Sequence, residues 1–326
     1  MSPELPGIHH VTAVTGSAPA NVDFYTRVLG LRLVKKTVNQ DDLTAYHLFY
    51  GDRVGSPGTE LTFFDWPQSP PAIGGAATIA PVALTVVDES ALSWWADRFD
   101  SFGVAHGLAR SEAGLSRLEF QDPEGQRLEL VADDPAPGGV PWRAPGVPLE
   151  VSLRGFHDVT VTSARPEATE LLLTEVMGFK ALWSSPPGSG AGRVVIYGTA
   201  GGGAGSRVRL AWPTPGQLGS VGIGGVHHVA FRAIDDDAQS AWRDRLLAAG
   251  LRVTPIIDRY YFRSIYFREP GGALFEIATD GPGFTGDESE DELGRRLSLP
   301  PFLESRRAEI EGGLRPIEGT SSAPWH

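Results

Sequence analysis

The stretch ALSWWADRFDSFGV (residues 91–104) recurs as AQSAWRDRLLAAGL (residues 238–251). This shift of 147 residues also carries DPEGQRLEL (122–130) onto EPGGALFEI (269–277). At nearly the same shift, GIHHVTAV (7–14) resembles GFHDVTVT (155–162). A constant offset over this distance indicates an internal duplication, and we place the main boundary near residue 148.

Each half divides again into two similar modules. A short alternating strand comes first, an amphipathic helix follows, and further strands complete a βαβββ unit. Glycines stand where each helix needs a left-handed stop, at Gly30, Gly103, Gly178 and Gly250. We therefore predict an α+β protein of four βαβββ modules in two domains, residues 1–148 and 149–284, followed by a polar helical tail over 285–326.

Composition narrows the classes of function. The 326 residues include no cysteine, so disulfides and thiolate ligands are excluded and a metal would need His, Asp or Glu. The net charge of −12 argues against a nucleic-acid partner. No apolar run is long enough for a membrane span, and the N-terminus lacks a signal-peptide pattern. We expect a cytoplasmic protein with a small-molecule partner and no membrane partner; a homo-oligomer is compatible with the sequence.

Two histidine pairs, His9-His10 and His227-His228, each begin a module. Neighbouring strand residues point to opposite faces, so one histidine of each pair should face a shared cavity. His9 shares its face with Val11, and this apolar face should pack on the helices. The same alternation assigns His227 to the helix side and turns His10 and His228 toward the concave side.

Glu276 is the third candidate ligand. In LFEIA its two apolar neighbours should lie under the helices, so Glu276 faces the same concave side. Two imidazoles and one carboxylate form the facial triad suited to Fe(II) and dioxygen chemistry, although Mn(II), Co(II) or Zn(II) also accept such ligands.

The duplication predicts that only one of two cavities holds a metal. Asp158 matches His10, Pro81 matches His228, and Glu129 matches Glu276. The first and fourth modules alone keep a histidine pair, so the cavity between them is the predicted metal site.

Several stretches together resemble a known family. They are GIHHVTAVTGSAPANVDFYTRVLGLRLVKKTVNQDD (7–42), YHLFYGDRVGSPGTELTFF (46–64), GVHHVAF (225–231), DRYYFRSIYFREPGGALFEIATDGPGF (258–284) and the tail LSLPPFLESRRAEIE (297–311). The chain resembles the vicinal oxygen chelate superfamily, also called the glyoxalase/bleomycin-resistance/dioxygenase fold. Within it, the chain looks like the hydroquinone-type ring-cleaving dioxygenases. The resemblance implies two glyoxalase-like domains with curved mixed sheets.

The resemblance also implies roles for individual residues. The family's metal ligands fall on His10, His228 and Glu276. Tyr266 would be a hydroxyl near the metal or the substrate, and Arg259 would hold a phenolate or the ring-opened product. The spacing of DRYYFRSIYF around Arg259 departs from the family pattern. His9 and His227 would support the ligands.

The implied activity is that of an Fe(II)-dependent extradiol-type dioxygenase, which cleaves the ring of a hydroquinone or catechol with dioxygen. Two alternatives remain open. A glyoxalase-like isomerase or lyase would take a fourth ligand from TELTFF, where Thr62 stands opposite Glu276 and Glu60 lies two residues away on the same face. A non-catalytic small-molecule binding protein of the same fold is the second alternative.

Overall fold

The computed structural model describes residues 4–110, 114–133, 139–186, 192–199, 202–214 and 216–317. Within them the chain forms four βαβββ modules, as the sequence repeat predicts. No helix in these ranges is both long enough and apolar enough to cross a membrane.

The first half contains modules one and two. Module one comprises β1 (Ile8–Thr15), α1 (Ala18–Asp23) continued by the π-helical turn η1 (Phe24–Val28), β2 (Arg32–Asn39), β3 (Asp42–Gly51) and β4 (Glu60–Asp65). Module two comprises β5 (Thr78–Val86), α2 (Glu89–Phe102), β6 (His106–Arg110), β7 (Ser116–Gln121) and β8 (Arg127–Ala132). A 3₁₀ turn, η2 (Leu149–Val151), follows.

The second half repeats this order. Module three comprises β9 (Phe156–Thr162), α3 (Pro166–Leu171) with the π-helical turn η3 (Leu172–Val176), β10 (Lys180–Ser184), β11 (Val194–Gly198) and β12 (Arg207–Ala211). Module four comprises β13 (Gly225–Ala233), α4 (Asp236–Ala248), β14 (Ile257–Asp258), β15 (Arg263–Arg268) and β16 (Leu274–Thr279).

Local sequence explains the ends of the helices. Asp88 and Asp235 each cap a helix, because their side chains accept a hydrogen bond from the backbone N–H three residues later. The predicted stop glycines all have left-handed φ angles: 66° at Gly30, 68° at Gly103, 78° at Gly178 and 82° at Gly250.

The strands form two eight-stranded sheets that each combine a module from either half. One sheet has the order β14-β15-β16-β13-β1-β4-β3-β2, and the other has β10-β11-β12-β9-β5-β8-β7-β6. The predicted boundary near residue 148 separates the two halves of the sequence, whereas each sheet combines the halves, pairing module one with four and module two with three. Each sheet is mixed, because the first contains the parallel pair β1–β4 and the antiparallel pair β1–β13, and the second contains the parallel pair β5–β8 and the antiparallel pair β5–β9. The predicted α+β fold with two glyoxalase-like domains is confirmed.

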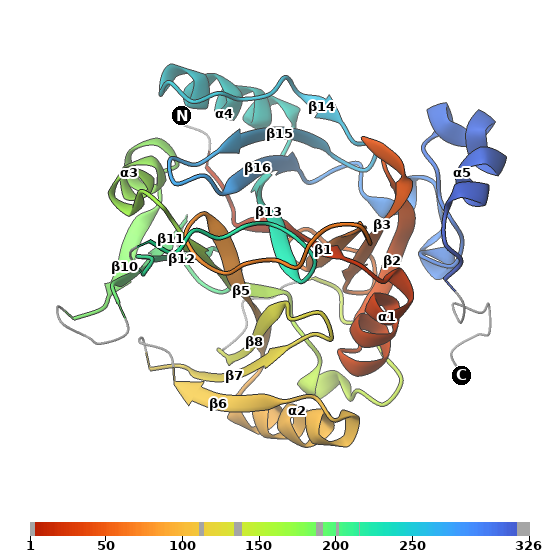
Figure 1. The fold of residues 1–326 in the computed structure, drawn as a ribbon, viewed down its shortest axis with the longest axis horizontal. Coiled ribbons are helices and arrows are strands. Elements are labelled where there is room, and N and C mark those ends of the chain that lie inside the picture. Colours follow the sequence, from red (N-terminus) through yellow and green to blue (C-terminus); the bar gives the residue numbers. More distant parts are fainter. Residues whose placement is uncertain are drawn as a thin grey trace.

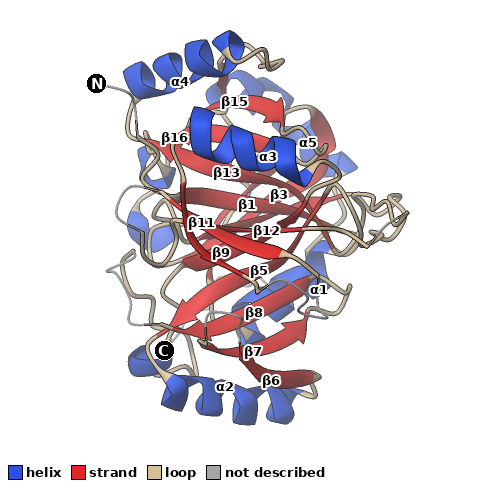
Figure 2. Ribbon diagram, turned by 90° about the vertical axis from the view of Figure 1, so that its left-hand side faces the viewer, coloured by secondary structure: helices blue, strands red, loops and turns tan. Residues whose placement is uncertain are grey.

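Helices cover the outer sides of the sheets. Figures 1 and 2 show α4 and α2 at opposite ends of the molecule with the strands between them. Trp95 of α2 and Trp242 of α4, which the repeat superposes, are 0% and 1% exposed in the main core. A smaller apolar cluster, which includes Phe49, Phe262 and Phe284, lies apart from that core.

The expectation that His9 and His227 face the helices is wrong, because a β-bulge at each residue turns its side chain to the other face of the sheet. The β1–β13 register skips both residues, while their neighbours pair regularly. Ile8 and Val11 both belong to the main core, so the extra residue places His9 beside His10 and not on the helix side. The imidazoles of His9 and His10 both contact the Phe262 ring, at centroid distances of 5.3 and 5.1 Å.

The tail packs against the first sheet. It contains the 3₁₀ turns η4 (Phe284–Gly286), η5 (Glu290–Glu292) and η6 (Pro301–Arg306) and the helix α5 (Arg307–Gly313). Figure 1 shows α5 outside β2 and β3. Leu299, Leu303 and Ile310 are buried, so the predicted polar helical tail is only partly helical and has an apolar inner side. Residues 318–326 of the predicted tail lie outside the described residues.

Candidate metal centre

Three buried side chains from three adjacent strands converge in the first sheet. His10 lies on β1, His228 on β13 and Glu276 on β16, and they are 1%, 3% and 0% exposed. The Nε2 atoms of the two histidines are 3.3 Å apart, and Glu276 Oε2 lies 3.4 Å from His10 Nε2 and 2.9 Å from His228 Nε2. One atom of each residue lies within 4.8 Å of the others, which is the spacing of a metal-ligand set.

The donor set fits a divalent cation. Glu276 Oε1 accepts a hydrogen bond from Ser264 Oγ at 2.5 Å, whereas buried Oε2 has no hydrogen-bond partner. Burial alone would raise the pKa of Glu276, but the charge and hydrogen bonds that His10 and His228 supply in their protonated forms hold it well below the usual value, so the carboxylate is ionised. Burial lowers the pKa of His228, which favours the neutral form that binds metal. A cation between these atoms would satisfy the unpartnered oxygen and leave coordination positions open.

His9 fixes the tautomer of His10. His9 Nε2 donates to the backbone oxygen of Thr279 at 3.1 Å, so its Nδ1 is the acceptor in the 3.0 Å contact with His10 Nδ1. His10 Nδ1 then carries the proton, and His10 Nε2 presents a lone pair to the convergence point. Burial, followed by the charge of His10, lowers the pKa of His9 well below its usual value and favours this neutral chain.

His227 repeats this relation with His228. Their Nδ1 atoms are 2.7 Å apart. Burial, followed by the charge of His228, lowers the pKa of His227 to about 3, so His227 is neutral at physiological pH and can accept the proton of His228. Such partners orient ligand imidazoles and raise their basicity.

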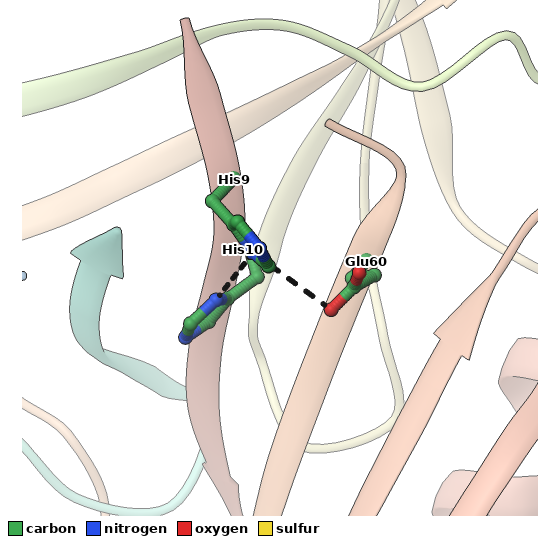
Figure 3. A group of neighbouring side chains, drawn as sticks. All are labelled: His9, His10 and Glu60. Carbon is green, nitrogen blue, oxygen red and sulfur yellow. Dashed lines mark hydrogen bonds and ion pairs between the residues drawn. The ribbon is translucent and has the colours of Figure 1, made fainter. Parts of the chain in front are cut away.

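Glu60 lies near His9 of the His9-His10 pair, apart from the convergence point. Figure 3 shows His9 and His10 leaving one strand, with the Glu60 carboxylate of the neighbouring strand near His9; the Nδ1–Oε2 distance is 4.0 Å. Glu60 groups with His9 and His10, apart from Glu276. Thr62 takes a different position, where its hydroxyl contacts Thr12 Oγ1 at 2.8 Å and His47 Nε2 at 3.1 Å.

A cavity of ≈ 40 Å³ adjoins the convergence point. Arg259 and Tyr266 line it; Arg259 Nε donates to Tyr266 Oη at 3.4 Å, and Arg259 Nη2 pairs with Asp41 at 2.8 Å. The structure thus brings these two predicted residues together beside His10 and His228. Burial, followed by the charge of Glu276, raises the pKa of Tyr266, so its hydroxyl keeps its proton at neutral pH.

Sequence reasoning missed several residues of this cavity. His47, Phe49 and Phe64 come from β3 and β4, and Phe262 comes from the segment before β15. Burial, followed by the charge of His10, lowers the pKa of His47, so the imidazole is neutral. The alternation of YHLFYGD could have assigned His47 and Phe49 to one face, but only the curvature of the sheet brings that face to the histidine pairs.

The second sheet fills the matching place with arginine. Arg117 donates to Glu129, and it donates to Asp158 at 2.7 Å. Arg209 also reaches Glu129, at 3.1 Å. In the part of the chain that the structure describes, both groups of three His, Asp or Glu side chains with metal-ligand spacing lie in the first sheet.

Comparison with known proteins agrees with this geometry. The model of the Glyoxalase/Bleomycin resistance protein/Dioxygenase superfamily matches residues 7–130 and 155–277. A provisionally named ring-cleaving dioxygenase, MhqA of Bacillus subtilis (strain 168), is 47% identical over 313 residues, which cover 96% of this chain and 99% of the relative. The chlorohydroquinone/hydroquinone 1,2-dioxygenase of Sphingobium indicum is 36% identical over 312 residues, covering 93% and 94%.

A solved structure agrees as well. The crystal structure of a provisionally named dioxygenase from Bacillus subtilis subsp. subtilis str. 168 has a TM-score of 0.90 and 39% identity, and the match covers 97% of this chain and 99% of that chain. The chain therefore belongs to the Glyoxalase/Bleomycin resistance protein/Dioxygenase superfamily and, within it, to the ring-cleaving dioxygenases.

Proposed function

We propose that the chain is an Fe(II)-dependent, extradiol-type dioxygenase that opens the ring of a hydroquinone or a catechol. One observation carries the proposal: His10, His228 and Glu276 form a buried two-histidine, one-carboxylate set beside a cavity with aromatic walls, which the two histidines line. This ligand set is typical of non-haem iron oxygenases. The hydroquinone 1,2-dioxygenase among the relatives supports the choice of substrate class.

The chain would bind and orient the ring. Phe49, Phe64 and Phe262 provide apolar walls, so a planar aromatic compound could enter with one hydroxyl directed at His10 and His228. Iron held by the three ligands would supply the redox chemistry that allows dioxygen to cleave the bond beside the oxygen-bearing carbon, with both oxygen atoms retained in the product. The apolar walls exclude bulk water from the reacting atoms.

Neutral groups around the ligands would handle protons. The Tyr266 hydroxyl can donate a hydrogen bond to a substrate oxygen, and Arg259 orients that hydroxyl. The Arg259 guanidinium is positioned to offset the charge of a phenolate or of the ring-opened carboxylate product. The neutral His47 can accept the proton that the substrate hydroxyl releases.

The position of Thr62 supports a dioxygenase over an isomerase. A glyoxalase-like reaction would need a further carboxylate on the metal, and the nearest candidate, Glu60, groups with His9 and His10 only. Thr62 is held by Thr12 and His47. A non-catalytic binding protein with the same site would bind the substrate without consuming oxygen, so a measurement of turnover distinguishes this alternative from a dioxygenase.

The test is metal analysis of anaerobically purified protein, followed by an oxygen-electrode assay with hydroquinone and catechol. We expect one metal per chain and oxygen uptake that depends on added Fe(II). Substitution of Mn(II), Co(II) or Zn(II) identifies the metals that support turnover. Absence of oxygen uptake by the Fe(II)-loaded protein with both substrates would refute the proposal.

A further inference from the structure

Thr37 on β2 is a buried hydroxyl without a partner. Its side chain is 4% exposed and lines the same cavity as His10 and His228. Among the described residues that line this cavity, Thr37 Oγ1 is the buried side-chain polar atom that makes no hydrogen bond. An unsatisfied buried polar group is costly, so a persistent one calls for a ligand or a water molecule that completes it.

Neighbouring polar groups of the β2–β3 turn already have partners. Asn39 Oδ1 accepts from the backbone N–H of Asp41, and Gln40 Nε2 donates to the backbone oxygen of Arg259 at 2.9 Å. The Asp41 carboxylate pairs with the Arg259 guanidinium. These contacts leave the Thr37 hydroxyl available to a molecule in the cavity.

The topology places Thr37 across the cavity from the metal ligands. His10, His228 and Glu276 lie on the neighbouring strands β1, β13 and β16, whereas β2 is the edge strand beyond β4 and β3. Since His10, His228 and Thr37 all line one cavity, the curved sheet must bring β2 round to the opposite wall. A ring with one oxygen at the histidines therefore turns its far end toward β2.

Both sides of β2 hold Thr37 in place. Thr37 pairs with His47 on β3, and on the outer edge the tail residue Ser298 donates its N–H to the backbone oxygen of Lys36 at 2.9 Å. The preceding residue on the same face, Lys35, is fully buried and pairs with Asp287 and Glu288 of the tail. A hydroxyl on such a fixed strand is organised before the ligand binds.

We propose that Thr37 is a specificity-determining residue that hydrogen-bonds the substituent opposite the metal-bound oxygen, and so selects 1,4-dihydroxybenzenes over 1,2-dihydroxybenzenes. The inference rests on the proposed function for its orientation of the ring. In a 1,4-diol the second hydroxyl lies at the far end of the ring and reaches Thr37; in a 1,2-diol both hydroxyls lie at the metal end. A hydroxyl both donates and accepts, so it fits either protonation state of the distant oxygen.

The test compares four proteins: wild type, Thr37→Val, Thr37→Ser and Thr160→Val. Thr160 on β9 is a matched control, because it is also a buried strand threonine whose hydroxyl has no partner, but it lies in the other sheet. The dissociation constants of hydroquinone and catechol are measured anaerobically by calorimetry on Mn(II)-loaded protein. The kcat/KM of the Fe(II)-loaded protein is then measured for both compounds.

We expect Thr37→Val to weaken hydroquinone binding roughly 10- to 100-fold and to change catechol binding less than about 2-fold. Thr37→Ser should retain most of the preference, and Thr160→Val all of it. Equal losses for both diols in Thr37→Val, or no loss for hydroquinone, would overturn the inference. Because binding is read without turnover, a wild-type protein that binds both diols but consumes no oxygen would refute the proposed function and still decide the role of Thr37.

Discussion

Glu276 and Glu129 occupy matching positions of the repeat, and glutamine substitution at each should have opposite consequences. Glu276 Oε2 makes no hydrogen bond in the metal-free protein. We therefore expect Glu276→Gln to cost less than about 1 kcal/mol in the free energy of unfolding of the metal-free protein, the scale of one hydrogen bond. Loss of a residue that only supports a ligand lowers metal affinity about 10- to 100-fold. Because Glu276 is itself a predicted ligand, the metal affinity of Glu276→Gln should fall further than that.

Glu129→Gln should destabilise the protein without affecting the metal. Arg117 is 3% exposed at its side chain and shares its charge between Glu129 and Asp158. Removing one partner of a buried ion pair lowers the free energy of unfolding by about 3–5 kcal/mol. Because Asp158 still pairs with Arg117 in the variant, we expect a loss near the lower end, about 3 kcal/mol.

The assay is urea unfolding of the metal-free variants, together with anaerobic titration of Fe(II) into each. Glu276→Gln should keep its unfolding midpoint and lose metal binding; Glu129→Gln should show the reverse. If Glu129→Gln loses the metal while Glu276→Gln retains it with full oxygen uptake, the metal lies in the second sheet and our assignment of the ligands is wrong.

Three further substitutions test the structure around the site. His9→Phe should weaken metal binding about 10- to 100-fold, because it removes the acceptor that orients His10. His227→Phe should weaken it less, because His227 is partly exposed and water can replace it as the acceptor. Equal metal affinities of the two variants would show that His9 does not fix the tautomer of His10. Lys35→Met should lower the free energy of unfolding by about 3 kcal/mol and speed proteolysis of the tail, because it leaves the buried Glu288 without its ammonium partner. An unchanged cleavage rate would show that Lys35 does not hold the tail on the first sheet. A hydrogen bond from His157 lowers the pKa of Asp133 from 3.8 to about 2, so this carboxylate stabilises the fold above pH 4 and loses that effect as the pH falls to 2. Asp133→Asn should therefore cost about 1 kcal/mol at pH 7, after allowance for partial exposure, and little at pH 2; equal losses at both pH values would count against the pair.

The sequence predicted the local elements because their determinants are local. The four glycines fix where the helices end, so the βαβββ modules could be predicted without knowledge of the packing. Asp88 and Asp235 cap α2 and α4 by an equally local interaction, which the sequence analysis did not use. The duplication also identified which modules share a histidine-bearing cavity, and the two sheets pair the modules accordingly.

Properties that depend on pairing partners could not be predicted from one strand at a time. The bulges at His9 and His227 exist only in the register between β1 and β13, and each reverses the face that simple alternation assigns. Thr37 and His47 reach the cavity because a curved sheet closes over it, which no local pattern encodes. Arg117, which pairs with Glu129 in the second sheet, comes from β7, whereas the predicted metal ligands lie on β1, β13 and β16.

The two sheets solve one electrostatic problem in two ways. Each brings a buried glutamate, Glu276 or Glu129, to the same place in its module, and a buried carboxylate needs a compensating charge. In the second sheet Arg117 and Arg209 provide that charge permanently by pairing with Glu129. Asp158, which follows the bulge residue His157, turns its carboxylate toward the same two arginines. In the first sheet neutral histidines occupy the bulges, and Glu276 keeps an unpartnered oxygen. A fixed guanidinium has no open coordination position, whereas a metal ion does. The choice of arginine or histidine around one conserved strand geometry is therefore sufficient to explain why we expect only the first sheet to carry the oxygen chemistry.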